Sequence, residues 1–283
     1  MTLMGAGRYT STMNLPALLP ELSRLISEAP SSPGVYIIYG EPAGLPLYIG
    51  KSINIRSRLQ SHSRSAKSRR FLDRAQRIEY RLTAGEVGAL LLESQLIKTM
   101  RPLYNKRLRR NRRLCSVRLQ GNQIQVVDTT QPTPGAPLYG LFRTPRSANE
   151  ALRQLADTHG LCLSLLGLEP PTNRACFRAQ LGKCRGACHG KESHSEHQSR
   201  LQTALQQLQI HYWPYPGAIA IHEQHGGLEE FHVINHWHYL GSWSTRQEAH
   251  QAPAHSPSDF DADSYLILLR PVLEAKGIVH LPG

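Results

Sequence analysis

Five side chains in the first third of the chain could together hydrolyse a phosphodiester. Tyr36 and Tyr48 belong to the triplets Gly-Val-Tyr and Tyr-Ile-Gly, and Lys51, Arg58 and Glu93 follow them. A phenol can take a proton from water if cationic neighbours favour its phenolate. Guanidinium and ammonium groups stabilise the charge that develops on a phosphate, and a carboxylate can hold a divalent cation. This combination predicts phosphodiester cleavage.

Glu93 is the most unusual of these residues, because it stands among apolar ones. The segment 85–100 has helical periodicity, and Glu93 falls on the same face as Leu90, Ile97 and Met100. An ionised carboxylate on such a face costs several kcal/mol unless something pairs with it. An arginine partner would explain it structurally, and a metal-binding or catalytic role explains it equally well.

The tyrosine triplets lie in two short apolar segments that predict strands over 34–39 and 47–49. The Gly- and Pro-rich stretch between them predicts a turn, so the two strands should form a hairpin. Alternation over 77–83 predicts a third strand.

A helix is expected over 53–63, capped by Ser52. Arg58 and His62 are four residues apart on that helix, so their side chains can point at one target. A short helix is also expected over 20–28.

Positive charge is concentrated in one part of the sequence. The chain of 283 residues has a net charge of +12, and residues 51–113 hold 18 Lys and Arg against four acids. Such a block is typical of a polyanion-binding surface, because neutralised phosphates release counterions. A generally basic, solvated surface is the alternative.

Four of the five cysteines lie within 27 residues, with 13, 7 and 3 residues between them. Clustered thiols in a chain with few other cysteines indicate metal ligation, and four thiolates suit zinc or an iron–sulfur cluster. Buried thiols without a metal are the alternative. Cys115 is expected to be a packed strand residue; the clustered cysteines are Cys162, Cys176, Cys184 and Cys188.

The rest of the chain predicts an α+β protein. Beyond residue 113 we expect strands at 117–119, 123–127, 139–142, 218–221, 231–234 and 265–269, with helices over 147–158 and 193–210. The expected parts are an N-terminal segment 1–30, a first domain 31–107, a β-α connection 108–160, a four-cysteine region with a helix 161–212 and a β-rich or α+β unit 213–283. Seven histidines between residues 222 and 255 lack a tight ligand spacing.

The sequence predicts a cytoplasmic protein. It contains no apolar stretch of about 20 residues and no secretory pattern at its start. Thiols stay reduced in the cytoplasm, so the cysteines are not expected to form disulfides.

The first hundred residues resemble the GIY-YIG nuclease superfamily, and in particular the N-terminal nuclease of the UvrC family. The resemblance rests on PGVY, LYIGKS, RSRL, LLLESQLIK and RPLYNKRL in that order. The later segments YGLFRTPRSANEAL and ACFRAQLGKCRGAC also have UvrC counterparts. The similarity covers residues 30–212, and the tail resembles the shorter Cho branch of the family.

This resemblance implies a GIY-YIG domain, a small antiparallel sheet flanked by helices, and a role for each residue. Glu93 would hold one divalent cation, Mg²⁺ or Mn²⁺, Tyr48 would be the general base, Lys51 would favour its phenolate, and Arg58 would stabilise the transition state. Supporting roles would fall on Tyr36, His62 and Asn105. Phosphate contacts would come from Arg56, Arg69, Arg70, Lys106, Arg107, Arg109, Arg110, Arg112 and Arg113, and the cysteines would hold a [4Fe-4S] cluster, with zinc as the alternative.

The implied function is excision repair of damaged DNA. A chain with a single nuclease, lacking the UVR motif and the second nuclease of UvrC, is expected to make one incision on the 3′ side of a lesion. It would act as a monomer on double-stranded DNA that UvrB has bound, with UvrA upstream. A sequence-specific homing or restriction enzyme and a non-catalytic nucleic-acid-binding scaffold are the alternatives.

Overall fold

The computed structural model describes residues 20–40, 44–105, 114–130, 135–171, 174–252 and 260–281. The chain divides into two compact units, which are described separately below. One contains Met1–Arg109 and Glu223–Glu229, and the other contains Arg110–His222 and Glu230–Gly283. The run of basic residues 106–113 that was predicted to contact phosphates lies outside the described residues.

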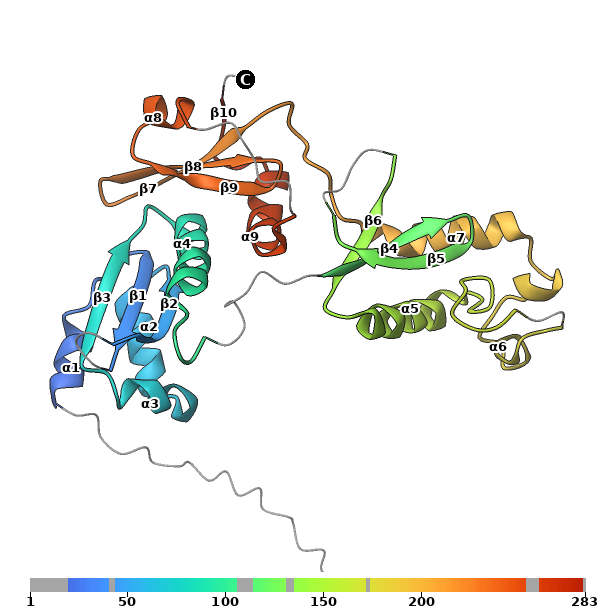
Figure 1. The fold of residues 1–283 in the computed structure, drawn as a ribbon, viewed down its shortest axis with the longest axis horizontal. Coiled ribbons are helices and arrows are strands. Elements are labelled where there is room, and N and C mark those ends of the chain that lie inside the picture. Colours follow the sequence, from blue (N-terminus) through green and yellow to red (C-terminus); the bar gives the residue numbers. More distant parts are fainter. Residues whose placement is uncertain are drawn as a thin grey trace, which may run out of the picture. The chain divides into compact units, whose positions relative to one another are not determined.

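Three antiparallel strands form the sheet of the first unit (Figure 1). They are β1 (Gly34–Tyr39), β2 (Pro46–Ser52) and β3 (Arg77–Leu82), in the order β2-β1-β3. The predicted hairpin and third strand are therefore confirmed. The central strand is apolar throughout because both of its faces are covered.

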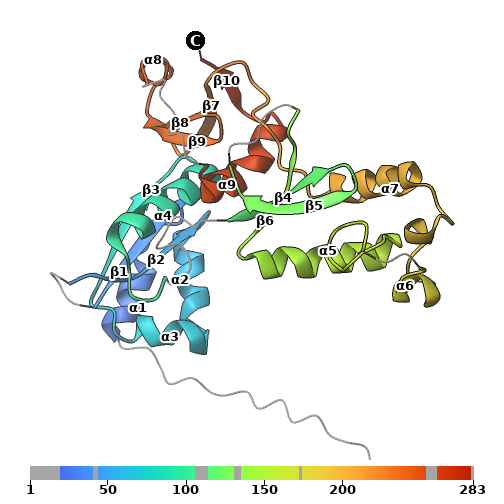
Figure 2. The ribbon, with the colours of Figure 1, turned by 45° about the vertical axis from the view of Figure 1, so that its right-hand side comes forward.

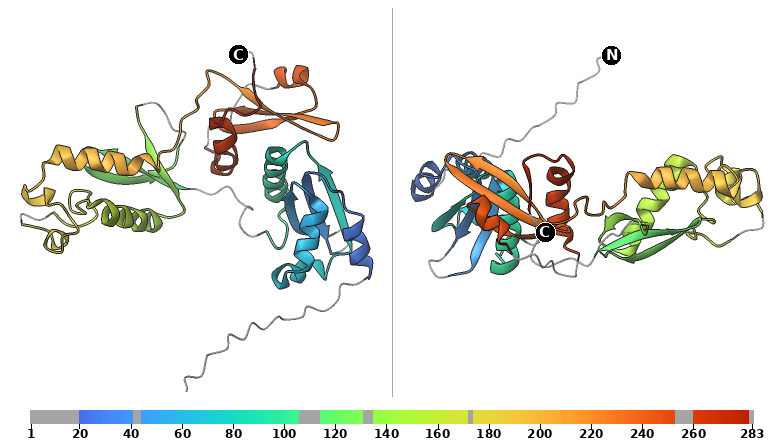
Figure 3. Two further views of the ribbon diagram at one scale, coloured as in Figure 1. Left: turned by 180° about the vertical axis from the view of Figure 1, so that it is seen from behind. Right: turned by 90° about the horizontal axis from the view of Figure 1, so that it is seen from above.

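Alternate residues of β1 enter two different cores. Tyr36 and Ile38 pack with three helices, α1 (Pro20–Ser27), α2 (Ile55–Ser63) and α3 (Ala66–Leu72). Val35 and Ile37 pack on the opposite face against the last helix of the unit, α4 (Glu86–Met100). The ribbon seen from behind shows α4 alongside the sheet of this unit (Figure 3). The period of two along the strand thus separates the two faces.

The start of α2 differs from the sequence prediction, and the end of α4 has a local cause in the sequence. The N-cap of α2 is Asn54, whose side chain accepts from the amide of Ser57, and not Ser52 as expected. Ser52 instead accepts from the amide of Asn54 and so supports the cap. Helix α4 ends at Arg101 in the left-handed conformation (φ 48°), since Pro102 disfavours a helical residue before it.

The second unit begins with a three-stranded antiparallel sheet covered by two helices (Figures 1 and 2). Its strands are β4 (Cys115–Gln120), β5 (Gln123–Asp128) and β6 (Leu138–Phe142), in the order β5-β4-β6. The helices α5 (Pro145–His159) and α7 (His194–Gln206) pack against it.

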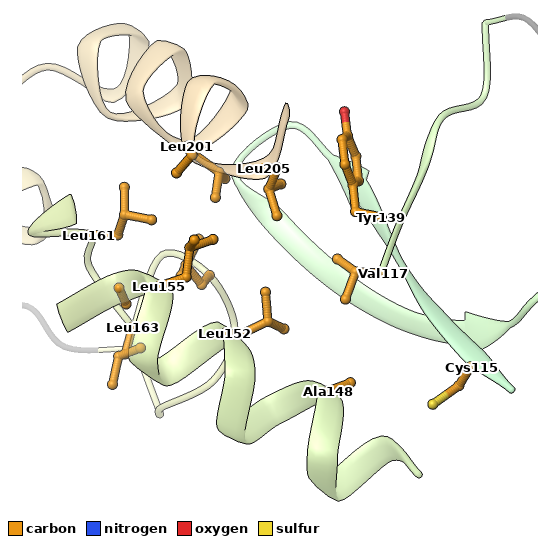
Figure 4. Close-up of a cluster of buried hydrophobic side chains, with 13 residues drawn as sticks. Cys115, Val117, Tyr139, Ala148, Leu152, Leu155, Leu161, Leu163, Leu201 and Leu205 are labelled. Carbon is orange, nitrogen blue, oxygen red and sulfur yellow. The ribbon is translucent and has the colours of Figure 1, made fainter. Parts of the chain in front are cut away.

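The core between this sheet and its helices is aliphatic. Val117 of β4, Leu152 of α5 and Leu201 of α7 converge in it (Figure 4). Cys115 lies at one end of the same cluster, which confirms its prediction as a packed strand residue. The strands and helices predicted from the sequence in this part are confirmed, within a few residues at their ends.

The segment between α5 and α7 has little regular structure. It contains the short helix α6 (Phe177–Gln180) and one 3₁₀ turn, Ala187–His189. The four clustered cysteines lie in this segment and form their own buried cluster with Leu165 and Ala179.

Four antiparallel strands form the C-terminal sheet, in the order β10-β7-β8-β9. They are β7 (Ile219–His225), β8 (Leu228–Asn235), β9 (His238–Trp243) and β10 (Ile278–His280), accompanied by α8 (Arg246–His250) and α9 (Ala262–Leu273).

The strand predicted over 265–269 is wrong, because this segment is part of α9. Asp261 caps the helix with its carboxylate, and Tyr265, Leu268 and Val272 are buried at the spacing of one helical face. Because the residues between Tyr265 and Leu268 are also apolar, the sequence pattern of this segment is typical of a strand. Among the described residues, no helix is long and apolar enough to cross a membrane.

Candidate active site

Four rings converge beside the hairpin of the first unit. Tyr48 stacks on Phe71 with centroids 4.3 Å apart, and His62 meets both Tyr48 and Phe71 edge-on. Tyr36 contacts Tyr48 and His62 with centroid distances of 6.2 and 5.9 Å. Strands β1 and β2 supply the tyrosines, and α2 and α3 supply the other two rings.

Gly50 is required where the two tyrosines meet. It pairs with Tyr36 across the hairpin. A Cβ atom on Gly50 would lie 2.3 Å from the Tyr36 hydroxyl and 2.8 Å from the Tyr48 ring. The glycine of the second triplet therefore makes room for both phenols.

Buried hydrogen bonds link the Tyr36 hydroxyl to the helices. It lies 2.7 Å from Nε2 of His62, and Nδ1 of His62 lies 2.7 Å from the Ser68 hydroxyl. Burial, with help from the nearby Arg58, lowers the pKa of His62 to about 4. His62 is therefore neutral at pH 7, with one nitrogen donating and the other accepting.

Glu93 reaches from α4 to the edge strand β2. Its Oε1 accepts a hydrogen bond of 3.1 Å from the amide of Lys51. Burial raises the pKa of Glu93 to about 7, although the Lys51 amide, the Lys51 charge and the Arg58 charge oppose the rise. The protein compensates the negative charge of this half-buried carboxylate only in part. A bound cation would compensate the rest.

The ammonium of Lys51 points away from the tyrosines. Its Nζ forms an ion pair of 2.6 Å with Glu86. The effect of Lys51 on the pKa of Tyr48, expected from the sequence, finds no support in this geometry. Arg58 takes that place: burial raises the pKa of both Tyr36 and Tyr48, and the charge of Arg58 opposes both rises.

The pKa of Tyr48 is nevertheless raised from its ordinary value. Burial is the largest cause, and the charge of Glu93 adds to it, whereas Arg58 and a hydrogen bond from Tyr36 act against it. A cation at Glu93 would offset the contribution of that carboxylate.

Asn105 supports the strand that carries Tyr48. Its Oδ1 accepts from the amide of Ile49 at 2.9 Å, and its Nδ2 donates to the carbonyl of Ile49 at 2.8 Å. The side-chain amide thus replaces a neighbouring strand at the free edge of β2. This contact agrees with the supporting role expected for Asn105.

Two of the arginines predicted to contact phosphates make internal contacts. Arg56 donates from Nε to the carbonyl of Ala29 at 2.7 Å, and the buried Arg69 pairs with Asp73 at 2.6 Å. Both contacts favour structural roles over the predicted ones. Arg70 is exposed and stays a prediction.

Sequence reasoning missed three residues of this site: Ser68, Phe71 and Glu86. The helix α3 that carries Ser68 and Phe71 was not predicted, so neither residue could be placed. Glu86 was counted only as one of the four acids of residues 51–113. Phe71 could have been placed near His62 if the basic stretch that follows His62 had been recognised as helix-forming.

The cysteines of the second unit form a second candidate site. The sulfur atoms of Cys162, Cys176, Cys184 and Cys188 all lie within 4.8 Å of one another. Four thiolates around one zinc ion at about 2.3 Å would lie about 3.8 Å apart, and the same donors also suit an iron–sulfur cluster. The donor set therefore fits a metal site and leaves its identity open.

Backbone amides point at two of these sulfur atoms. The amide of Cys176 points at the sulfur of Cys188, and the amide of Gly186 at that of Cys184. Burial raises the pKa of Cys188, but the Cys176 amide, the His189 ring and the neighbouring thiols outweigh it and lower the pKa to about 7. Burial raises the pKa of Cys162 and of Cys176, so the lowered pKa that suits a metal ligand is that of Cys188.

Family models cover most of the sequence in three consecutive pieces. Residues 32–106 match the UvrC-like GIY-YIG domain. Residues 113–207 match the middle domain of the UvrC/Cho excinuclease, and residues 218–283 match the C-terminal domain of excinuclease Cho.

Curated proteins show the same similarity over nearly the whole length. The chain is 47% identical over 255 residues to excinuclease Cho of Escherichia coli K12, covering 89% of this chain and 86% of that protein. It is 47% identical over 258 residues to excinuclease Cho of Salmonella typhimurium, covering 90% and 88%. UvrABC system protein C of Geobacter metallireducens is 33% identical over 188 residues, which are 63% of this chain and 30% of that protein.

Among solved structures, the chain is similar to the magnesium-bound GIY-YIG N-terminal endonuclease domain of UvrC from Thermotoga maritima. The identity is 36%, the match covers 31% of this chain and 99% of that one, and the TM-score is 0.29.

Proposed function

The chain belongs to the UvrC/Cho family of GIY-YIG excinucleases, and we propose that it makes a single incision on the 3′ side of a lesion in double-stranded DNA. The observation that carries this proposal is the meeting of Tyr36 and Tyr48 at Gly50, with His62 bonded to Tyr36 and Glu93 bonded to the amide next to Gly50. One such site supports one cut.

Glu93 would hold a divalent cation, Mg²⁺ or Mn²⁺. Its raised pKa and half-buried position support this assignment, because a bound cation compensates a buried carboxylate better than the single amide of Lys51 does. The cation would supply Lewis-acid stabilisation to the phosphate.

Tyr48 is the proposed general base. As the phenolate, it would take a proton from the attacking water while the water oxygen bonds to phosphorus and the bond to the 3′ oxygen breaks, and the leaving 3′ oxygen would take up a proton from solvent. The products are a 3′-hydroxyl and a 5′-phosphate. Arg58 opposes the rise in the pKa of Tyr48 that burial causes, and it presents an exposed guanidinium, which suits the additional charge of the transition state.

Tyr36, His62 and Asn105 position the base. Tyr36 donates toward Tyr48, His62 holds Tyr36, and Asn105 fixes the strand through Ile49. The exposed Arg70 and the basic run 106–113 are proposed to contact phosphates, so DNA affinity should fall steeply with salt.

The incision is proposed to depend on UvrB bound at the lesion, with UvrA upstream and this protein acting as a monomer. The test uses an end-labelled duplex with a single bulky adduct, incubated with and without UvrA and UvrB. One UvrB-dependent cut on the 3′ side is expected. A sequence-specific double-strand cut in undamaged DNA would instead support a homing-type enzyme.

We infer that the four cysteines hold a [4Fe-4S] cluster, with zinc as the alternative. Their donor set supports a metal site of either kind. Protein purified without oxygen should be brown and should lose its iron when Cys176 or Cys184 is replaced by serine. Cys115→Ser is the matched control and should retain the metal. Stoichiometric zinc without iron would decide for the alternative.

A further inference from the structure

The four-cysteine segment displays two large apolar side chains to solvent. Phe177 and Leu181 are 70% and 56% exposed. The amide of Leu181 donates to the carbonyl of Phe177, so the two residues lie one helical turn apart on the same side of α6. We call this pair the apolar tip.

The apolar tip is attached to a restrained part of the fold. Cys176 immediately precedes Phe177, Cys184 follows Leu181 by three residues, and both cysteines are buried in the sulfur cluster. Arg178 ties α6 to α5 through an ion pair of 2.6 Å with Asp157. A restrained side chain loses little entropy when it binds a partner, so the exposed apolar pair suits recognition.

The surroundings of the apolar tip are basic. Between residues 174 and 191 the sequence holds five Lys and Arg and no acid. Lys183, Arg185 and Lys191 are exposed. This charge is complementary to a polyanion and disfavours a basic or plainly apolar protein partner.

An open hollow of about 940 Å³ adjoins the apolar tip. Ala179 and Gly182, on either side of Leu181, line it together with Arg185 and Lys191. Across the hollow Arg200 pairs with Glu192 at 2.8 Å and so cancels that carboxylate. The remaining acid of the lining, Glu196, is outweighed by Arg185 and Lys191.

We propose that the apolar tip and this hollow form a second DNA contact that recognises unpaired bases. Phe177 stacks on a base that has left the helix, Leu181 fills the space beside it, and Arg185 and Lys191 hold the adjoining phosphates. Aromatic rings bind unstacked bases without regard to sequence, and apolar wedges favour distorted steps. A lesion-distorted duplex offers both features. The inference rests on the proposed function, because damaged DNA is the ligand.

The test measures binding of the full chain to fluorescent DNA by anisotropy, without added divalent cation. Two duplexes are compared, one perfectly paired and one with a three-nucleotide bubble. Phe177→Ala should weaken binding to the bubble by about tenfold and leave the paired duplex nearly unchanged. Phe177→Trp should restore the preference. Leu266→Ala, at a leucine of α9 that is 59% exposed, is the matched control.

A second pair of measurements separates stacking from charge. A 2-aminopurine in the bubble should be quenched by the wild type and not by Phe177→Ala. The double variant Arg185→Gln/Lys191→Gln should weaken both duplexes alike and reduce the salt slope by about 1 to 2. The metal content of every variant is also measured, so that loss of metal from the four-cysteine site is recognised.

Equal binding of Phe177→Ala and wild type to both duplexes would refute the proposal. Unchanged DNA binding with lost binding to purified UvrB would also refute it and would make the apolar tip a protein-docking surface. Neither readout needs cleavage. A failure of the 3′ incision would therefore count against the proposed function, and a failure of bubble recognition against this inference alone.

Discussion

Nε2 of His62 lies 2.7 Å from the hydroxyl oxygen of Tyr36, and both side chains are buried. Because His62 is neutral, only one tautomer leaves the Tyr36 proton free to donate to Tyr48. In that tautomer Ser68 donates to Nδ1 of His62, and Nε2 donates to Tyr36. A hydrogen bond donated by Ser68 would thus favour the tautomer in which the Tyr36 proton faces the proposed base.

Ser68→Ala should therefore lower turnover by about tenfold or more with little change in KM, since the base loses its orientation. Ser68→Thr, which keeps the hydroxyl, should recover most of the rate. Ser61→Ala removes an exposed hydroxyl from α2 and is the matched control. Single-turnover incision at several pH values measures the effect, and a Ser68→Ala enzyme with the normal rate and pH profile would exclude the positioning role.

His62 should also make the fold sensitive to acid. Its pKa is about 4 in the folded protein against an ordinary 6.5, so the unfolded chain binds more protons between these values. Stability is then lost as the pH falls from 6.5 toward 4, by about 3 kcal/mol at most. Urea unfolding of wild type and His62→Phe should show a smaller loss in the variant. Identical pH dependence of the two would mean that His62 does not titrate in this range.

Glu93→Gln should abolish incision while DNA affinity stays nearly unchanged, because cation binding and phosphate contacts use different residues. The folded pKa of about 7 exceeds the ordinary 4.5, so the metal-free fold becomes less stable as the pH rises from 4.5 through 7. Metal-free Glu93→Gln should therefore unfold at a higher temperature than wild type at pH 8, and equally at pH 4.

Magnesium provides a separate check on Glu93. It should raise the Tm of wild type at pH 8 and leave that of Glu93→Gln unchanged. Glu28→Gln, at an exposed acid of α1's C-terminal end, should respond as wild type does. A magnesium response that persists in Glu93→Gln would place the cation elsewhere.

Gly50→Ala should disable the enzyme through packing. The added methyl group would lie 2.3 Å from the Tyr36 hydroxyl, and this steric clash is relieved only if the buried ring of Tyr36 moves. We expect a loss of about 1 to 3 kcal/mol in stability and a larger loss in activity. Gly217→Ala, in open space, should change neither. Normal incision by Gly50→Ala would show that the two phenols need not meet.

The sequence predicts the site best where local patterns and chemistry coincide. Tyr36 and Tyr48 could be placed because strand periodicity brings them to one side of a hairpin, and Glu93 because a carboxylate on an apolar face requires an explanation. Ser68 and Phe71 could not, since their helix α3 is short and strongly basic and so shows no apolar stripe.

The wrong strand over 265–269 came from competition between neighbouring signals. The residues between Tyr265 and Leu268 are also apolar, which is typical of a strand, and the cap at Asp261 was overlooked. Arg69 stays a prediction as a phosphate contact, although it is buried and pairs with Asp73, because charge alone does not distinguish a buried cation from an exposed one.

Hydrogen bonds from within the unit occupy much of the outer edge of β2. Asn105 occupies both backbone groups of Ile49, the amides of Leu103 and Tyr104 donate to the carbonyls of Pro46 and Leu47, and Glu93 accepts from the amide of Lys51. An unprotected edge strand can recruit an extended segment of another chain and start edge-to-edge aggregation. Few backbone groups of this edge are left for such pairing, so the strand that carries Tyr48 is protected against edge-to-edge association.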